Sequence, residues 1–170
     1  MTTPLYEVEV LQHEADARLI QQFLLSDAAF DDPRTTPGEV AYFHAMPYDA
    51  LAGRCVCLYV RNERGEIAGC SSYKENEQQT GGYEWDYLAV HRDYRKLGLA
   101  LVLYEAMLER LREAGARYLL TYTCSLEQYG PVRKLFDRCG FVLTGRCPDY
   151  YYEGEDRLVY YLDLRGANAN

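Results

Sequence analysis

The stretch Leu88-Ala89-Val90-His91-Arg92-Asp93-Tyr94-Arg95-Lys96-Leu97-Gly98-Leu99-Ala100 is the most informative part of this chain. An apolar strand ends in it, a basic turn follows, and a glycine opens a long amphipathic helix. Glycine lets the backbone come close to a bound group because it has no Cβ. The first amides of a helix lack internal partners and, with the helix dipole, form a site for phosphate. The segment therefore predicts a ligand-binding turn, and a strand–turn–helix with a merely basic surface is the alternative.

The hydrophobic periodicity on either side of this stretch predicts eleven elements. Strands are expected at 6–10, 55–61, 67–74, 83–90, 117–123, 141–144 and 158–164. Helices are expected at 15–25, 39–51 (interrupted by Pro47), 98–114 and from Pro131 to Gly140. Segments 26–38 and 145–157 are rich in turn-forming residues and are predicted to be loops. Short turns make neighbouring strands antiparallel, and the helix after strand 83–90 makes the next strand parallel to it. The expected fold is α/β (α+β), a mixed seven-stranded sheet with helices on both faces, in the order β-α-α-β-β-β-α-β-α-β-β.

The bulk composition indicates one soluble domain. A chain of 170 residues with 48% hydrophobic residues can bury its own core, so we expect a single domain at 1–164 and a disordered tail at 165–170. The net charge of -8 argues against nucleic-acid binding. It favours either a cationic substrate or simply solubility. Neither a secretory signal nor a membrane span is recognisable, which predicts a cytoplasmic protein with no membrane partner.

The cysteines and histidines give no pattern typical of a metal site. Six cysteines contain no C-x-x-C pair, and the three histidines are scattered along the chain. The C-x-C at Cys55 and Cys57 has no second half at zinc spacing. We expect most of the cysteines to be small buried hydrophobes and predict no metal.

Three segments, in the expected order, resemble the GCN5-related N-acetyltransferase (GNAT) superfamily. The first is the V-x-x-x-x-R-x-x-G-x-A pattern from Val90 to Ala100. The second, Leu135-Phe136-Asp137-Arg138-Cys139-Gly140-Phe141, is similar to the family's L-Y-E-K-x-G-F, and the third is 154–160, similar to G-E-D-A-x-x-M. The resemblance covers residues 6–164.

The resemblance implies acetyl-CoA as the acetyl donor and a primary amine, either a small cationic amine or a peptide amine, as the acceptor. The backbone around Ala89, at Leu88 and Val90, would bind the pantetheine arm, and Phe136 would be a wall beside the thioester. The pyrophosphate would be surrounded by Arg95, Lys96, Leu97, Gly98, Leu99 and Ala100. Dimers are common in the family, so a homodimer is a further expectation.

The strand that ends at Val90 also carries two candidate functional carboxylates. Alternation places Glu84, Asp86, Leu88 and Val90 on one face of that strand. Amine acetylation needs a base, direct or through water, because only the neutral amine attacks. We predict Glu84 as this base, at a position where some family members have a glutamate, and Asp86 as a substrate contact. The alternative is that both are acids that bind a cation or meet water.

The general acid is where this chain departs from the family pattern. The family often has a tyrosine where this chain has Phe136, and an asparagine where it has Tyr129. Three alternatives stay open: the thiolate leaves without an acid, another tyrosine donates the proton, or catalysis is lost. Tyr129, Tyr122 and 150–152 are the candidate donors, and we predict Tyr129 as the catalytic one.

The tyrosine-rich segment 150–152 lies in the last hairpin, which lines the acceptor site in the family. Tyr150 and Tyr151 are predicted substrate contacts, because aromatic faces hold cations, although amphipathic rings on a hairpin are an equally good explanation. The alternative function is a non-catalytic acyl-CoA-binding or sensing module. Motifs for nucleoside triphosphates and dinucleotides are absent from the sequence.

Overall fold

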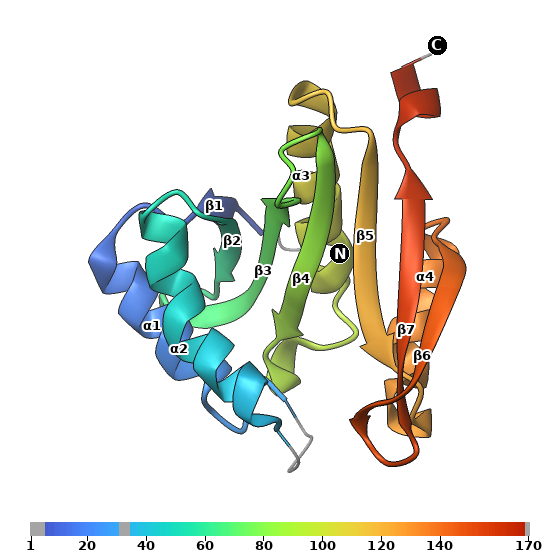
Figure 1. The fold of residues 1–170 in the computed structure, drawn as a ribbon. Coiled ribbons are helices and arrows are strands. Elements are labelled where there is room, and N and C mark those ends of the chain that lie inside the picture. The colour runs from blue at the N-terminus through green and yellow to red at the C-terminus, as the bar shows by residue number, and fades with distance from the viewer. Residues whose placement is uncertain (1–5, 31–34, 169–170) are drawn as a thin grey trace. The chain divides into compact units, whose positions relative to one another are not determined.

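The computed structural model describes residues 6–30 and 35–168, and it confirms the mixed seven-stranded sheet (Figure 1). The strand order across the sheet is β1-β2-β3-β4-β5-β7-β6. The strands are β1 (Val8–Val10), β2 (Val56–Arg61), β3 (Ile67–Glu75), β4 (Gly82–Val90), β5 (Tyr118–Cys124), β6 (Val142–Tyr152) and β7 (Glu155–Asp163). The helices are α1 (Glu14–Leu24), α2 (Pro37–Leu51), α3 (Leu99–Glu113) and α4 (Gly130–Arg138), with 3-10 turns η1 (Arg92–Tyr94), η2 (Glu127–Tyr129) and η3 (Arg165–Asn168).

The chain divides into two compact units, and β4 and α3 contribute residues to both. The first unit contains Met1–Lys74 and Tyr87–Leu111. The second contains Glu75–Asp86 and Arg112–Asn170. Each unit is described in turn.

In the first unit, β1, β2 and β3 pair antiparallel and carry helices on both faces. Helices α1 and α2 cover one face, where Ile20 and Phe43 belong to the same buried cluster as Cys57. Helix α3 covers the other face. Its side chains Leu99 and Leu103 pack so closely on Gly69 of β3 that a Cβ at this glycine would lie 3.3 Å from each of them. Cys57, Cys70 and Cys124 are buried as expected, whereas Cys55 and Cys139 are half-buried and Cys147 is exposed, so the expected burial holds for half of the cysteines.

Helix α2 runs uninterrupted through Pro47, so the expected break at this residue is wrong. A proline inside a helix removes one hydrogen bond and crowds the preceding turn. Here Pro47 is buried with its neighbour Met46, and the start of the helix is fixed by a capping box. The Thr36 Oγ1 accepts from Glu39 N–H at 3.1 Å, while the Thr36 N–H donates to Glu39 Oε2 at 2.8 Å. Packing and capping together outweigh the local cost of the proline.

In the second unit, β4 and β5 run parallel and β7 pairs antiparallel with both β5 and β6. The described β4–β5 pairing runs from Gly82↔Tyr118 to Trp85↔Thr121. At its end, Thr121 Oγ1 donates a buried hydrogen bond to the Trp85 carbonyl at 3.1 Å. Helix α4 covers one face of these strands through the aromatic core residue Phe136. The other face carries Glu84, Asp86 and Tyr122.

The segment 145–157 is not the loop that its composition predicts. Strands β6 and β7 extend through most of it, and a bulge between Cys147 and Tyr152 takes up the residues that do not pair. Asp156 fixes this bulge, because its carboxylate accepts from the Asp149 N–H at 2.9 Å and from Arg146 Nε. The Asp156 N–H in turn donates to Ser125 Oγ at 3.0 Å.

The end of the described chain is partly regular. Arg165–Asn168 form the 3-10 helix η3, where a disordered tail was expected, and residues 169–170 lie outside the described residues. Residues 31–34 of the predicted loop 26–38 also lie outside them. Within 6–30 and 35–168, the helices are all too short or too polar to cross a membrane.

Candidate active site

The peptide groups at the end of β4 point alternately to the two sides of the strand. The His91 N–H bonds the Ala68 carbonyl of β3 at 2.9 Å. Because neighbouring residues in a strand direct their peptide groups to opposite sides, those of Leu88 and Val90 point away from β3. These are the two residues expected to bond a pantetheine arm through the backbone. Ala89 is buried, and its carbonyl faces Gly69.

The turn between η1 and α3 has the conformation of an anion cradle. Lys96 and Gly98 both adopt left-handed conformations, with φ of 67° and 77°, on either side of the exposed Leu97. Such alternation directs successive N–H groups toward one point. The first helical bond runs from the Val102 N–H to the Gly98 carbonyl at 3.1 Å. The amides of the first helical turn before Val102 thus have no acceptor within the helix.

Gly98 leaves the space in front of this turn open. A Cβ built on Gly98 would meet nothing within 4 Å. Leu99 points the other way and is only 1% exposed, so only its backbone is available to a ligand, and Ala100 is half-buried. The turn, its open front and the helix start fit a diphosphate such as that of acetyl-CoA.

Arg95 supports the turn with its side chain. Its Nε donates to the Val90 carbonyl at 3.2 Å, and its Nη2 donates to the Ala29 carbonyl at 3.1 Å. The guanidinium thereby ties the turn to the end of β4 and to the segment after α1. Arg95 was expected beside the pyrophosphate. The structure shows in addition that its side chain holds the turn in place.

Glu84 and Asp86 share one face of the sheet with Tyr122 of β5. Burial is the main cause that raises the pKa of Tyr122, and the negative charges of Glu84 and Asp86 raise it further, against the opposing effect of Arg157. The two carboxylates therefore act on the same half-buried ring. A positively charged group that enters this face would meet two negative charges and an aromatic surface.

Arg157 is the residue of this face that sequence reasoning missed. Its guanidinium carbon lies 3.7 Å from the centre of the Tyr122 ring and 4.6 Å from that of Tyr150. Its Nη1 donates to the Tyr150 hydroxyl at 2.6 Å. Tyr150 was expected to bind a cationic group of the substrate. In the structure, its ring and hydroxyl contact the guanidinium of Arg157. Alternation along β7 was the available signal, because it places Arg157 on the face of Val159 and Tyr161.

The other predicted residues of the second unit lie apart from this face. Phe136 is 4% exposed, with its ring centre 5.1 Å from Tyr160 and 5.9 Å from Trp85. This core position accounts for the absence of a hydroxyl there. Tyr129 is half-buried where η2 leads into α4. The Tyr151 ring is perpendicular to Tyr150, 5.0 Å away.

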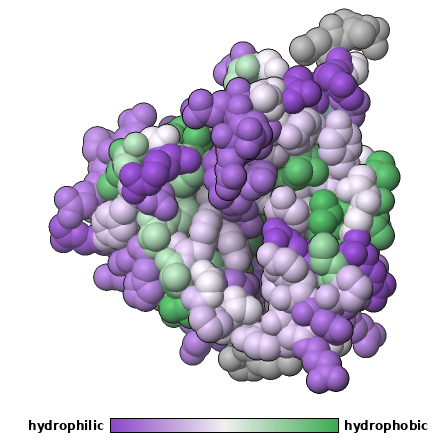
Figure 2. Space-filling model, viewed as in Figure 1, coloured by the Kyte–Doolittle hydropathy of each residue, from purple (hydrophilic) through white to green (hydrophobic). Residues whose placement is uncertain are grey.

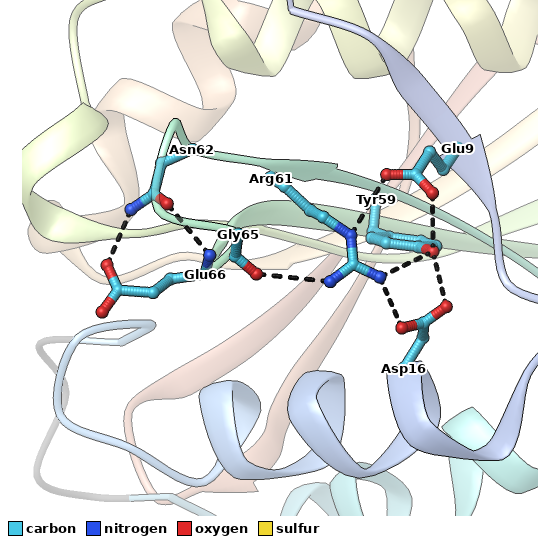
Figure 3. Close-up of polar contacts among 7 residues, drawn as sticks. All are labelled: Glu9, Asp16, Tyr59, Arg61, Asn62, Gly65 and Glu66. Carbon is cyan, nitrogen blue, oxygen red and sulfur yellow. Dashed lines mark hydrogen bonds and ion pairs between the residues drawn. The ribbon is translucent and has the colours of Figure 1, made fainter.

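A second polar cluster lies in the first unit, where α1, β1 and β2 meet (Figure 3). Arg61 bonds Asp16 and, at 3.2 Å, Glu9, while the Tyr59 hydroxyl lies 2.9 Å from the Asp16 carboxylate and 3.0 Å from that of Glu9. A cavity of about 750 Å³ is lined by residues of this region, among them Glu9 and Arg61. Arg61 pairs with both carboxylates of the cluster, and these contacts tie α1 to β1 and β2. We therefore assign it a structural role.

The surface view shows a mainly hydrophilic face. On the face shown in Figure 2, hydrophilic residues predominate and hydrophobic residues form small separate areas. Among the residues that the structure describes, no group of three or more histidine, cysteine or acidic side chains has the arrangement of a metal site.

Comparison with solved structures supports the fold. Solved structures share the fold: one described as an acetyltransferase of the GNAT family from Desulfovibrio desulfuricans superimposes with a TM-score of 0.80 at 22% identity, covering 93% of this chain and 98% of that one. The ribosomal-protein-S18-alanine N-acetyltransferase from Escherichia coli superimposes with a TM-score of 0.76 at 17% identity, covering 98% of both chains.

Sequence comparison gives the family. The uncharacterized N-acetyltransferase YsnE of Bacillus subtilis is 27% identical over 113 residues, which are 66% of this chain and 72% of that protein. The model of the acetyltransferase (GNAT) family matches residues 20–141, a range that includes the turn at Gly98 and the acidic face of β4. The chain therefore belongs to the GNAT family and is an acetyl-CoA-dependent N-acetyltransferase.

Proposed function

We propose that this enzyme transfers the acetyl group of acetyl-CoA to a primary amine, by direct attack of the amine on the thioester. The observation that carries the proposal is the pair of carboxylates Glu84 and Asp86 on the strand that leads into the anion cradle. A cationic ammonium is attracted to these carboxylates, and the neutral amine that attacks is formed by loss of a proton to one of them.

The residues of the chain take distinct parts in this reaction. Lys96, Leu97 and Gly98 hold the diphosphate through their backbone, and acetyl-CoA supplies the acetyl group as a thioester. Glu84 accepts the proton of the ammonium, while Asp86 binds and orients the amine. The backbone N–H groups at the end of β4 are the donors that we assign to the developing negative charge on the carbonyl oxygen.

Protonation of the leaving thiolate is assigned to Tyr129, because Phe136 has no proton to give. Tyr122 is the second candidate, since it lies on the face of Glu84 and its raised pKa keeps its hydroxyl protonated at neutral pH. The variants Tyr129→Phe and Tyr122→Phe separate the two. The donor is the residue whose loss slows turnover without weakening acetyl-CoA binding.

The test of the proposal is release of free CoA from acetyl-CoA in the presence of amines. The panel contains small polyamines, amino acids and peptides with a free N-terminus, since the solved relative from Escherichia coli is an alanine N-acetyltransferase of a ribosomal protein. We expect amine-dependent CoA release and a product heavier by one acetyl group. Acetyl-CoA binding with no turnover on any amine would favour a sensing module instead.

A further inference from the structure

The guanidinium of Arg157 is held between two aromatic rings and lacks a carboxylate partner. It stacks on Tyr122 and Tyr150, and its one described hydrogen bond goes to a tyrosine hydroxyl. Its Nε is buried and has no hydrogen-bond acceptor among the described residues. Stacking fixes the plane of the guanidinium but leaves its positive charge uncompensated.

Two other arginines of the same unit are paired with acids, whereas Arg117 and Arg133 bond backbone carbonyls. Arg146, on the neighbouring strand, pairs with Asp156, and Arg165 pairs with Asp163 at 2.8 Å. A buried N–H without an acceptor carries a desolvation cost. An arginine that only filled space between the rings would avoid that cost by turning its Nε toward a carbonyl or solvent. The arrangement at Arg157 is instead typical of a side chain that binds an anionic ligand.

The register of the strands places Arg157 on the same face as the two carboxylates. Tyr122 pairs with Val159, and Arg157 lies two positions before Val159 on β7. The side chains of Tyr122 and Arg157 therefore point to the face of Glu84 and Asp86. Strand β5 lies between β4 and β7. Two interstrand spacings separate the acidic strand from that of Arg157, about 10 Å at the backbone. The Tyr122 ring lies between the two carboxylates and the guanidinium. The carboxylates raise the pKa of its hydroxyl, and Arg157 lowers it.

We propose that the acceptor is an amine that also carries a carboxylate, and that Arg157 binds this carboxylate while Asp86 and Glu84 bind the ammonium. This inference rests on the proposed function and narrows its substrate class from amines to amino acids or short peptides. A carboxylate beside the guanidinium would balance its positive charge, and the planar guanidinium is suited to a bidentate pair with a carboxylate. Tyr122 then contacts the carbon chain between the two charged ends.

The experiment compares acceptors in matched pairs that differ only in the carboxylate: lysine with cadaverine, ornithine with putrescine, and phenylalanine with phenethylamine. For the wild type we expect kcat/KM to be about tenfold or more higher for the member that carries the carboxylate in at least one pair, mainly through KM. Equal or lower values for all three carboxylates would overturn the inference. This comparison needs no variant, so it holds even where a substitution impairs folding.

The variant Arg157→Gln removes the charge and keeps much of the side-chain size. We expect it to lower kcat/KM for the member that carries the carboxylate at least about tenfold more than for its carboxylate-free counterpart, so that the preference within the pair is lost. The matched control is Arg117→Gln, since Arg117 also lies over a tyrosine but bonds the Thr80 carbonyl through its Nε at 2.7 Å. A preference that persists in Arg157→Gln, or that falls equally in Arg117→Gln, contradicts the assignment. If no amine is acetylated at all, the proposed function fails rather than this inference.

Discussion

At the scale of single residues, Gly98 is the position where backbone conformation and ligand access coincide. Its φ of 77° strains any other residue, and the space before it is open. Gly98→Ala introduces this strain, about 1–2 kcal/mol, whereas Gly98→Trp also places a large ring where the diphosphate is expected. We predict that the dissociation constant of acetyl-CoA, measured by titration calorimetry, rises at least about tenfold more in the Trp variant than in the Ala variant. Equal affinities of the two variants would exclude this turn as the cradle.

Glu84 gives a second prediction at this scale. Glu84→Gln removes a proton acceptor without changing size, so kcat should fall by about 10²- to 10⁴-fold. The loss should be largest below the pKa of the amine, where most of the acceptor is protonated, and should shrink as the pH rises above it. The pH–rate profile of the variant measures this.

The control for that experiment is Glu113→Gln, at the exposed end of α3, which changes the net charge equally. It should leave the profile as in the wild type. If the Glu84 variant keeps the wild-type profile as well, another group or water alone is the base.

The role of a single residue can be predicted from the sequence when the residues that it acts with are close to it in the chain. Gly98 is recognisable because the strand, turn and helix that define it are contiguous in the sequence. Arg157 is not, because its partners come from β5 and from a bulge of β6, and no spacing within the chain signals that they meet. For the same reason, Tyr150 was predicted to bind a cationic substrate, and its contact with Arg157 of the same hairpin was not predicted.

At the scale of elements, local periodicity predicted the four α-helices and seven strands of the described residues but not the 3-10 helices, and the limits of the elements depended on tertiary pairing. Pro47 and the segment 145–157 both contain strong local signals for a break or a loop. Burial of Pro47 and pairing of β6 with β7 override them, and neither effect can be read from neighbouring residues.

Helix α2 provides the prediction at this scale. The Thr36 side chain caps the helix and shares a reciprocal pair of hydrogen bonds with Glu39. Thr36→Ala should lower the free energy of unfolding by about 1 kcal/mol, or Tm by about 3 °C. Thr36→Ser retains the hydroxyl and should remain within about 0.5 kcal/mol of the wild type. Urea denaturation of the three proteins measures the difference, and an equal loss in both variants would mean that the cap contributes little.

At the scale of the whole molecule, the two compact units each contain a carboxylate with a lowered pKa. For Asp16, burial acts to raise the pKa, but hydrogen bonds from Arg61 and Tyr59 outweigh it. For Asp156, the hydrogen bond from the Asp149 N–H, followed by that from Arg146, lowers the pKa. Since both folded values lie below the ordinary 3.8, the stabilisation is present above that pH. It is lost as the pH falls through the folded values.

These two carboxylates test whether the chain unfolds as one domain, as its length and composition predict. Strand β4 and helix α3 each contribute residues to both units, so neither unit can unfold without disrupting an element of the other. We therefore expect one thermal transition at pH 7, shifted to lower temperature by Asp16→Asn and also by Asp156→Asn. Toward about pH 3 the wild type should lose stability and its difference from each variant should narrow, because protonation removes the same interactions. Calorimetric scans would contradict this expectation if they showed two transitions, each sensitive to only one of the substitutions, since such units would fold independently.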